Sequence, residues 1–567
     1  MSFHSRSARS AGPDAVGLGE RGIVLAAALL FVLMTSLLVL TFMTTTTGER
    51  SQSSNVQTAK VALYAADAGV RAQQQILANL AKTKLDSCLA GWSHSGRIVT
   101  QPQLMFPAGT LGPSRSANST NPPYAATATV TFSGAAIADT AQVYNYLFNI
   151  TSSGTVRSSG KRIVQSQGLL RVSATRGSFA DYLLFMDSFV MPDGSPIWFT
   201  SSGSFDGRVH TNTYFRYAYK PTFQDQVTQV QPNATYFNNP NAPVSRNANN
   251  NGTIDVPNFF GGSLRGQASV PLPTNSFNQQ AASLGITGLA PGVSPSNSQI
   301  NTQLGLGSGG SVPPNNIYLP NDGGTPAHLT GGFYIQGSVD KVKMWADTLV
   351  NKQYYQFTQG STRKTVEVDP VNNTTKVWNA LSTTGSPVTT FTGTPPNGVL
   401  FTNGGITSLV GPDRSGAYVN ASIAENTALL ITATNDIVIN GDLTCDSFNN
   451  KNNVLGIFSS NGAVRIGTSA PTNLNIDAFI MATGPSGAFS VDSYGVGSPR
   501  GSMNLRGGVV AKYYGAFGTF DPKGAISTGF ARNWHYDRRG MVPPFYPQTV
   551  RFDADIPSAR TMAWKEI

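Results

Sequence analysis

Cysteine is almost absent from this sequence, and its scarcity argues against two common kinds of site. Cys88 and Cys445 are the only cysteines among 567 residues, and neither belongs to a CxxC or Cys/His cluster. Zinc and dithiol redox chemistry need such clusters, so we predict no metal site and no cofactor. The pair can form one disulfide in an oxidising compartment, but two unrelated buried thiols fit the sequence equally well.

Charged side chains are also scarce. They make up 12% of the residues, about half the ~25% of an average soluble protein, whereas Gly (58) and Pro (34) are frequent. This polar, uncharged and turn-rich composition is more typical of extracellular β-structure than of a cytosolic enzyme. The net charge of +10 favours acidic partners and leaves nucleic acid and anionic envelope polymers both open.

Signatures of catalysis are missing as well. The sequence contains no HExxH, Walker loop, GxSxG or dinucleotide fingerprint. Residues 247–255 imitate the spacing of a calcium loop, but Asn258 stands where the bidentate Glu belongs, so an asparagine-rich loop is favoured. A β-helix enzyme acting on polysaccharides would need paired carboxylates, and aspartates that are also ordinary turn residues are the candidates: Asp436, Asp442, Asp446, Asp477 and Asp492. We predict no catalytic residues and no enzyme.

The sequence does contain a long apolar run. Residues 23–43 are 21 residues without a charge, close to the ~20 that span a bilayer and longer than the ~7–15 of a signal peptide. Arg6, Arg9 and Arg21 precede the run. Since Lys and Arg stay on the cytoplasmic side, we expect a single-pass protein with its N-terminus inside and its head outside.

An amphipathic helix is expected to continue directly from this span. Residues 51–85 contain no proline. Apolar residues recur at helical spacing and form one stripe: Val56, Ala59, Leu63, Ala66, Val70, Leu77 and Leu80.

This N-terminal region resembles that of PilX-type minor pilins of type IV pili. The matching features are Arg21-Gly22 before the span, Glu49-Arg50 after it and the run at residues 65–70. The resemblance implies cleavage by a prepilin peptidase between Gly22 and Ile23, location in the bacterial inner membrane, and other pilins and the pilus assembly machinery as partners.

One position departs from the pattern of major pilins, which carry a glutamate where this chain has Ala27. That carboxylate pairs with the N-terminal ammonium of a neighbouring subunit. Its absence fits a subunit at a pilus tip, with no neighbour ahead of it, and equally fits a protein that is never cleaved and never polymerises.

The next 90 residues predict an antiparallel meander. Residues 124–133, 143–151 and 162–172 are rich in β-branched and aromatic side chains, with turn-like SSG stretches at 152–154 and 158–160. Further on, the GRVHTN motif at 207–212 resembles a domain of unknown function that follows this kind of helix. Its His210 has no catalytic partner placed by the sequence, and we expect a structural histidine.

Apolar β-rich segments repeat through the C-terminal third. Phe401, Leu430, Ile457, Ile480 and Val509 are separated by 29, 27, 23 and 29 residues, a period typical of solenoids. We predict a parallel β-helix whose earlier rungs include residues 331–339, 341–346, 354–358 and 365–368. An antiparallel sandwich is the alternative.

A pilin helix followed by a β-solenoid resembles competence-associated minor pilins, which receive DNA at a pilus tip. Between Arg500 and Arg551, eight Lys or Arg residues against two Asp give a local charge of +6, interleaved with aromatic residues. Cations that hold phosphates and rings that stack bases characterise single-strand binders, although a solubilising basic cap fits the same residues. The DNA-binding candidates are Arg506, Lys512, Lys523, Arg532, Trp534, Tyr536, Arg538 and Arg539.

The sequence therefore predicts a mainly β protein with one long N-terminal α-helix, an antiparallel meander and a parallel β-solenoid. The expected divisions are a leader (1–22), a transmembrane segment (23–43), a spine helix (44–85), a pilin-like head (86–177), a domain of unknown function (178–330) and a capped solenoid (331–567). The expected function is that of a tip minor pilin in pilus assembly and DNA capture; the alternative is a membrane-anchored adhesin or polymer-binding protein.

Overall fold

The chain forms two compact units. One comprises Met1–Leu85, Thr100–Ser173 and Ala554–Ile567, and the other Asp86–Val99 and Ala174–Asp553. The computed structural model describes residues 18–90, 109–110, 115–120, 123–132, 137–140, 143–156, 160–200, 203–218, 220–238, 242–246, 256–290, 292–416, 419–446, 452–520, 526–554 and 558–567.

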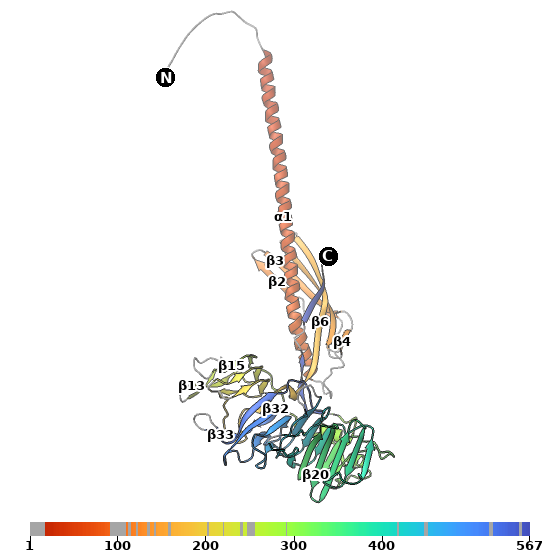
Figure 1. Ribbon diagram of the computed structural model, residues 1–567. Helices are drawn as coiled ribbons and strands as arrows, with labels where there is room; N and C mark the ends of the chain where they lie inside the picture. Colours follow the sequence, from red (N-terminus) through yellow and green to blue (C-terminus); the bar gives the residue numbers. More distant parts are fainter. Residues whose placement is uncertain are drawn as a thin grey trace, which may run out of the picture. The chain divides into compact units, whose positions relative to one another are not determined.

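The first unit is built on α1 (Leu18–Ala90), a single helix of 73 residues that Figure 1 shows running without a break. The predicted membrane span and spine are therefore one helix. Nearly all side chains from residue 22 to residue 57 are exposed. Further along, one stripe is buried: Ala62, Ala65, Ala66, Val70 and Leu77. Val56, expected in the stripe, is 53% exposed, so the packed part of the helix begins later than its apolar pattern suggests.

An eight-stranded sheet packs against this stripe. Its central strands β3, β5 and β6 pair antiparallel in that order, which confirms the predicted meander, and β36 pairs antiparallel with the other edge of β6. The sheet contains β1 (Gly109–Thr110), β2 (Arg115–Thr120), β3 (Pro123–Phe132), β4 (Ile137–Thr140), β5 (Val143–Val156), β6 (Gly160–Ser178), β35 (Gln548–Ala554) and β36 (Ser558–Glu566).

The turn predicted at residues 152–154 is wrong, because β5 runs straight through it. Gly154 is there for close packing. A Cβ at this position would lie 2.1 Å from the Ala62 carbonyl oxygen and 2.6 Å from the Ala66 nitrogen. The glycine and the small helix residues together let the helix backbone approach the strand. The second SSG stretch includes residues 158–159, which lie outside the described residues.

The second unit is organised around a run of parallel strands, called here the parallel stack. Each strand pairs in parallel with the next. The order is β18 (Phe333–Gln336), β24 (Val399–Thr402), β26 (Ala428–Ala433), β28 (Val454–Ser459), β30 (Asn475–Ala482), β32 (Pro499–Tyr514), β7 (Leu184–Ser188), β9 (Val209–Thr211), β12 (Val227–Gln229) and β16 (Ser263–Leu264). Residues 184–264 thus continue the same sheet as residues 333–514, across the division expected at 330.

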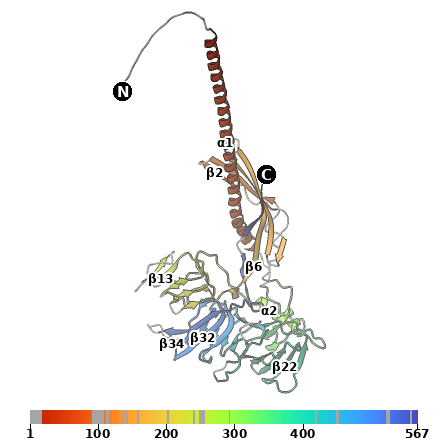
Figure 2. The ribbon, with the colours of Figure 1, turned by 45° about the horizontal axis from the view of Figure 1, so that its top comes forward.

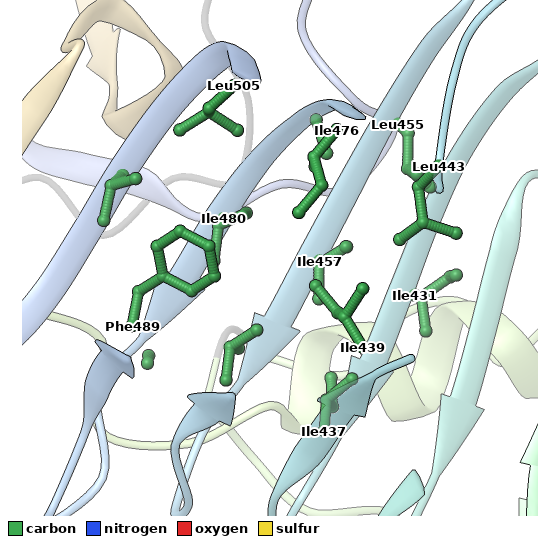
Figure 3. Close-up of a cluster of buried hydrophobic side chains, with 14 of the residues drawn as sticks. Ile431, Ile437, Ile439, Leu443, Leu455, Ile457, Ile476, Ile480, Phe489 and Leu505 are labelled. Carbon is green, nitrogen blue, oxygen red and sulfur yellow. The ribbon is translucent and has the colours of Figure 1, made fainter. Parts of the chain in front are cut away.

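The predicted repeat register is correct in one half of the stack and wrong in the other. Ile457, Ile480 and Val509 are direct neighbours, and Figure 3 shows Ile457 and Ile480 projecting into one apolar interior. In the other half, however, Ile431 pairs with Ile457, and Leu400 pairs with Ile431. The predicted Leu430 and Phe401 each lie one residue away, on the opposite face.

That opposite face is also buried, which explains the slip. Leu430 packs with Phe458, Phe479 and Tyr546, and Phe401 with Leu284 of α2 (Phe277–Leu284) and Tyr334. A one-residue shift exchanges the two faces of a strand. When both faces are apolar, as in many parallel sheets, the sequence pattern does not distinguish them.

A second parallel ladder accompanies the first. It consists of β19 (Lys341–Asp347), β25 (Ile406–Val410), β27 (Ile437–Ile439), β29 (Val464–Ile466) and β31 (Ala488–Val491), ending on β32. Residues 354–358 and 365–368, predicted as rungs, belong instead to an antiparallel meander that extends from β19. Its further strands are β20 (Lys352–Gln359), β21 (Thr362–Asp369), β22 (Thr374–Trp378) and β23 (Thr389–Thr392).

The remaining elements, apart from β34 (Ile526–Tyr536), are short. β34 pairs in parallel with β32, its neighbour in Figure 2, and antiparallel with β33 (Gly518–Phe520). β17 (Asn316–Tyr318) pairs antiparallel with β18. Two small sheets and two further helical segments complete the unit: β10 (Arg216–Tyr217), β13 (Ala234–Asn238) and β14 (Ala242–Arg246); β8 (Ser204–Phe205), β11 (Thr222–Phe223) and β15 (Asn258–Phe259); η2 (Phe179–Asp181) and α3 (Asn297–Gln303).

Candidate functional site

The predicted cleavage site lies near the start of α1. Gly22 is the fifth residue of the helix, and no described atom lies within 4 Å of the position that its Cβ would occupy. Ile23 is 70% exposed. The bond is therefore accessible in this chain, and its cleavage stays a prediction.

Two of the DNA-binding candidates point into the interior of the second unit. The register of β34 on β32 sets Arg532 beside Met503 and Trp534 beside Leu505, both of which are buried. Trp534 is only 6% exposed. The Arg532 guanidinium carbon lies 5.2 Å from the centroid of the Tyr514 ring, and burial lowers the pKa of Arg532 to about 10. Trp534 packs in the core and presents no face to a nucleic-acid base, and Arg532 lies against the core aromatic rings.

Three further candidates at the end of β34 are held by the surrounding chain. The Tyr536 hydroxyl donates to the Ala180 carbonyl at 3.1 Å, and Arg538 donates to the carbonyl of Asp206. The Arg539 Nη2 lies 2.9 Å from Asp537 Oδ2. Only Arg538 of the three is an exposed residue.

Arg506 and Lys512, both on β32, also lie at or near the surface. The Arg506 side chain is 46% exposed, with Nε 3.8 Å from Asp477 Oδ1, and Lys512 Nζ lies 5.5 Å from the Tyr513 ring. Lys523 lies outside the described residues. The predicted basic surface is thus narrower than the charge count of the sequence suggests.

Cys445 carries a free, buried thiol, and burial raises its pKa. Its backbone N–H donates to Asp477 Oδ2 at 3.0 Å. Cys88 lies in the last turn of α1, but its side chain is outside the described residues, so the candidate disulfide stays a prediction.

Four of the five aspartates considered for catalysis, all but Asp446, have structural partners. Asp442 forms two hydrogen bonds with Arg414, at 2.5 and 2.7 Å, and Arg465 bridges Asp436 and Asp492. Within the part of the chain that the structure describes, no group of three or more His, Cys, Asp or Glu residues could hold a metal ion.

His210 of the GRVHTN motif is fixed by its neighbours. The Oδ1 of Asn212 accepts the Val270 N–H at 2.9 Å. Since this oxygen is an acceptor, His210 Nε2, 3.1 Å away, must donate to it. His210 Nδ1 lies 2.7 Å from the Thr228 hydroxyl oxygen. The imidazole therefore links β9, β12 and, through Asn212, residue 270, as expected for a structural histidine.

The same motif borders a polar cavity that the sequence did not predict. Phe185, His210, Thr228 and Leu264 are neighbours in register across β7, β9, β12 and β16. The last three line a cavity of about 210 Å³, together with Asp181, Tyr182, Arg208, Gln226, Gln267 and others. Only the strand register brings these separate segments together. The polar motif was the one signal in the sequence.

Comparisons with known proteins agree with the N-terminal pattern. Residues 21–71 match the family described as PilX N-terminal, and residues 143–231 match a domain of unknown function, DUF4900. A search of curated proteins found no match. Among solved structures, the competence-associated pilin ComZ from Thermus thermophilus is 14% identical, with a TM-score of 0.30 over 90% of this chain and 98% of that one.

Proposed function

Because its N-terminal region makes this chain a minor pilin-like protein of the type IV pilus class, we propose that α1 anchors it in the bacterial inner membrane and that it acts at a pilus tip in pilus assembly. One observation carries this proposal. The apolar window of α1 has a mean hydropathy of 2.9, and none of it is buried within the described chain. Phe31, Leu38 and Phe42 are 69%, 67% and 73% exposed. Such a surface is stable only against lipid or against the helices of other pilins.

Ala27 supports the tip position within this proposal. A glutamate here would neutralise the N-terminal ammonium of an adjacent subunit in an apolar filament core. In a subunit with no neighbour ahead of it, that glutamate would stay buried and unpaired, which costs several kcal/mol. A subunit at the tip is therefore more stable with alanine at this position. The head is outside the membrane in this arrangement, and its parallel stack acts as a β-solenoid with a binding rather than a catalytic role.

The experiment follows processing and location together. N-terminal sequencing of the membrane-bound chain should find Ile23 first, and Gly22→Glu should leave the leader attached. Gly48→Glu, at an equally open position of α1, is the matched control and should be processed normally. Immunogold labelling of purified pili should mark tips.

Other outcomes separate the alternatives. A membrane-bound chain that begins at Met1 or Ser2 would contradict processing by prepilin peptidase. Processed chains that are absent from pili would leave an anchored protein that does not polymerise.

DNA capture for uptake is a second proposal, supported by the net charge of +10 and by the exposed Arg506 and Arg538. Each phosphate contact should lower log affinity by ~0.7–0.9 per unit of log salt. Replacing Arg506 and Arg538 together by Glu should weaken DNA binding and flatten that slope. Binding to cells or glycans that persists at high salt, without DNA binding, would favour the adhesin alternative.

A further inference from the structure

The cavity beside the GRVHTN motif contains a cation whose position is unusual. Arg208 immediately precedes β9 and is half-buried. Its guanidinium carbon lies 5.3 Å from the centroid of the Tyr182 ring. Among the described residues, no hydrogen bond or ion pair to the guanidinium is found. A planar group that stacks on a ring keeps its edge of N–H donors available, and here these donors border the cavity.

Other arginines of the same unit are used differently. Arg216 also stacks on a ring, that of Tyr214 at 4.7 Å, but its Nη1 and Nη2 donate to the Phe189 carbonyl at 3.2 Å and the Tyr214 hydroxyl at 2.7 Å. Arg414 and Arg465 pair with aspartates. The edge of Arg208 is half-buried and borders the cavity, so it is available to an acceptor supplied from outside the chain.

The rest of the lining restricts that acceptor. Arginine binds carboxylates and phosphates through two parallel N–H bonds. The Asp181 carboxylate lines the same cavity and would repel a doubly charged phosphate more than a singly charged carboxylate. The Gln226 side-chain amide, which has no hydrogen bond to a described residue, and the Gln267 carbonyl oxygen can bind hydroxyl groups.

The cavity is also small. Its volume of about 210 Å³ is below the ~300–1,000 Å³ of pockets for drug-sized ligands, and therefore suits one sugar-sized group.

From these features we propose that the cavity binds an acidic monosaccharide unit, a hexuronate, with its carboxylate on Arg208 and its hydroxyls on Gln226 and Gln267. The unit can be a free sugar or one residue of an acidic polysaccharide. His210, which uses both ring nitrogens inside the protein, forms part of the floor and keeps β9 and β12 in place. The inference does not depend on the location of the protein in a pilus.

The test is calorimetric titration of the purified full-length chain in detergent. Glucuronate is the probe, and glucose and inorganic phosphate are the comparison ligands. Glucuronate should bind at least about tenfold more tightly than glucose, the loss expected when one charge-assisted pair of hydrogen bonds is missing, and more tightly than phosphate. An oligouronate that binds as well as glucuronate would identify the polymer as a source of the ligand.

Variants identify the residue responsible. Arg208→Gln should reduce glucuronate affinity about tenfold or more, and Arg208→Lys, which keeps the charge but loses the fork, should reduce it less. Arg216→Gln removes a stacked arginine whose donors are already used and should leave binding unchanged. Thermal unfolding of each variant shows whether the fold is retained.

Four results would overturn the proposal. The first three are the absence of glucuronate binding by the parent chain, equal affinity for glucose and glucuronate, and unchanged binding by Arg208→Gln. Tighter binding of phosphate would also overturn it, by showing a general anion site.

Discussion

Side chains of β34 show how one residue's role depends on the direction it faces. Trp534 packs with its ring centroid 5.2 Å from that of Phe517 and 6.1 Å from that of Phe489. Trp534→Ala should therefore destabilise the second unit by about 3–5 kcal/mol, the usual loss for a large buried aromatic side chain, measured by denaturant unfolding in detergent.

The control is Arg506→Gln, at a largely exposed position of β32. It should change stability by no more than about 1 kcal/mol, the usual upper value for losing a partly exposed ion pair such as that with Asp477. If Trp534→Ala were as stable as this control, the buried position of the indole would be wrong.

A cluster of charged side chains on the meander that extends from β19 should make the stability of the fold depend on pH. Burial by itself raises the pKa of Asp369, but hydrogen bonds from Asn372 and the Lys352 ammonium outweigh it and lower the pKa to about 2. A depressed carboxyl pKa stabilises the fold above the ordinary value of 3.8. That stability is lost as the pH falls toward 2. Thermal unfolding from pH 5 to pH 2 should show the loss.

Asp369→Asn should reduce this loss, because its side chain does not titrate. The variant is also expected to be less stable than the parent at pH 5, since Lys352 then retains only Glu367, 3.1 Å away. A parent and variant with parallel pH profiles would contradict the role of Asp369.

Among the elements, the contact between α1 and the sheet depends on a glycine. Gly154→Ala places a methyl group against the backbone of Ala62 and Ala66. Overpacking of this kind typically costs about 1–3 kcal/mol. Hydrogen exchange of residues 62–77 should become faster. The control is Gly48→Ala. This position lies within α1, and no described atom would contact the added methyl group, so hydrogen exchange of residues 62–77 should not change.

The elements themselves were more predictable than their arrangement. The long helix and strands β3, β5 and β6 follow from apolar periodicity and β-branched residues. Gly154 was predicted to lie in a turn because the sequence does not distinguish a glycine that forms a turn from a glycine that allows close packing of another backbone. Residues 354–358 and 365–368 are good strands, but whether a strand pairs in parallel or antiparallel depends on its connections.

The candidate site was less predictable still. Charge and aromatic content marked the stretch from Arg500 to Arg551, but burial inverts the role of Arg532 and Trp534. The cavity near Arg208 joins residues from five separate segments, so no local pattern contains it.

For the molecule as a whole, the exposed half of α1 should account for membrane association. A chain that begins at residue 51 keeps the buried stripe from Ala62 to Leu77 and should remain folded without detergent, because it lacks the apolar span. Sedimentation with liposomes measures the difference: the full chain should sediment and the shortened chain should stay in solution. Sedimentation of both would show that the head itself binds lipid.

The pairing of β36 with β6 has a consequence for when the protein can fold. Ser558–Glu566 pairs with β6, almost 400 residues earlier in the chain, with Arg560 opposite Leu169. Contacts so distant in sequence form late and slow folding. During synthesis the intervening residues 174–553 emerge first, so the first unit stays unfinished until nearly the entire polypeptide has been made. A nascent chain released after residue 553 should therefore be cleaved by protease within residues 160–171, whereas the complete chain should resist cleavage there because β36 then covers the edge of β6.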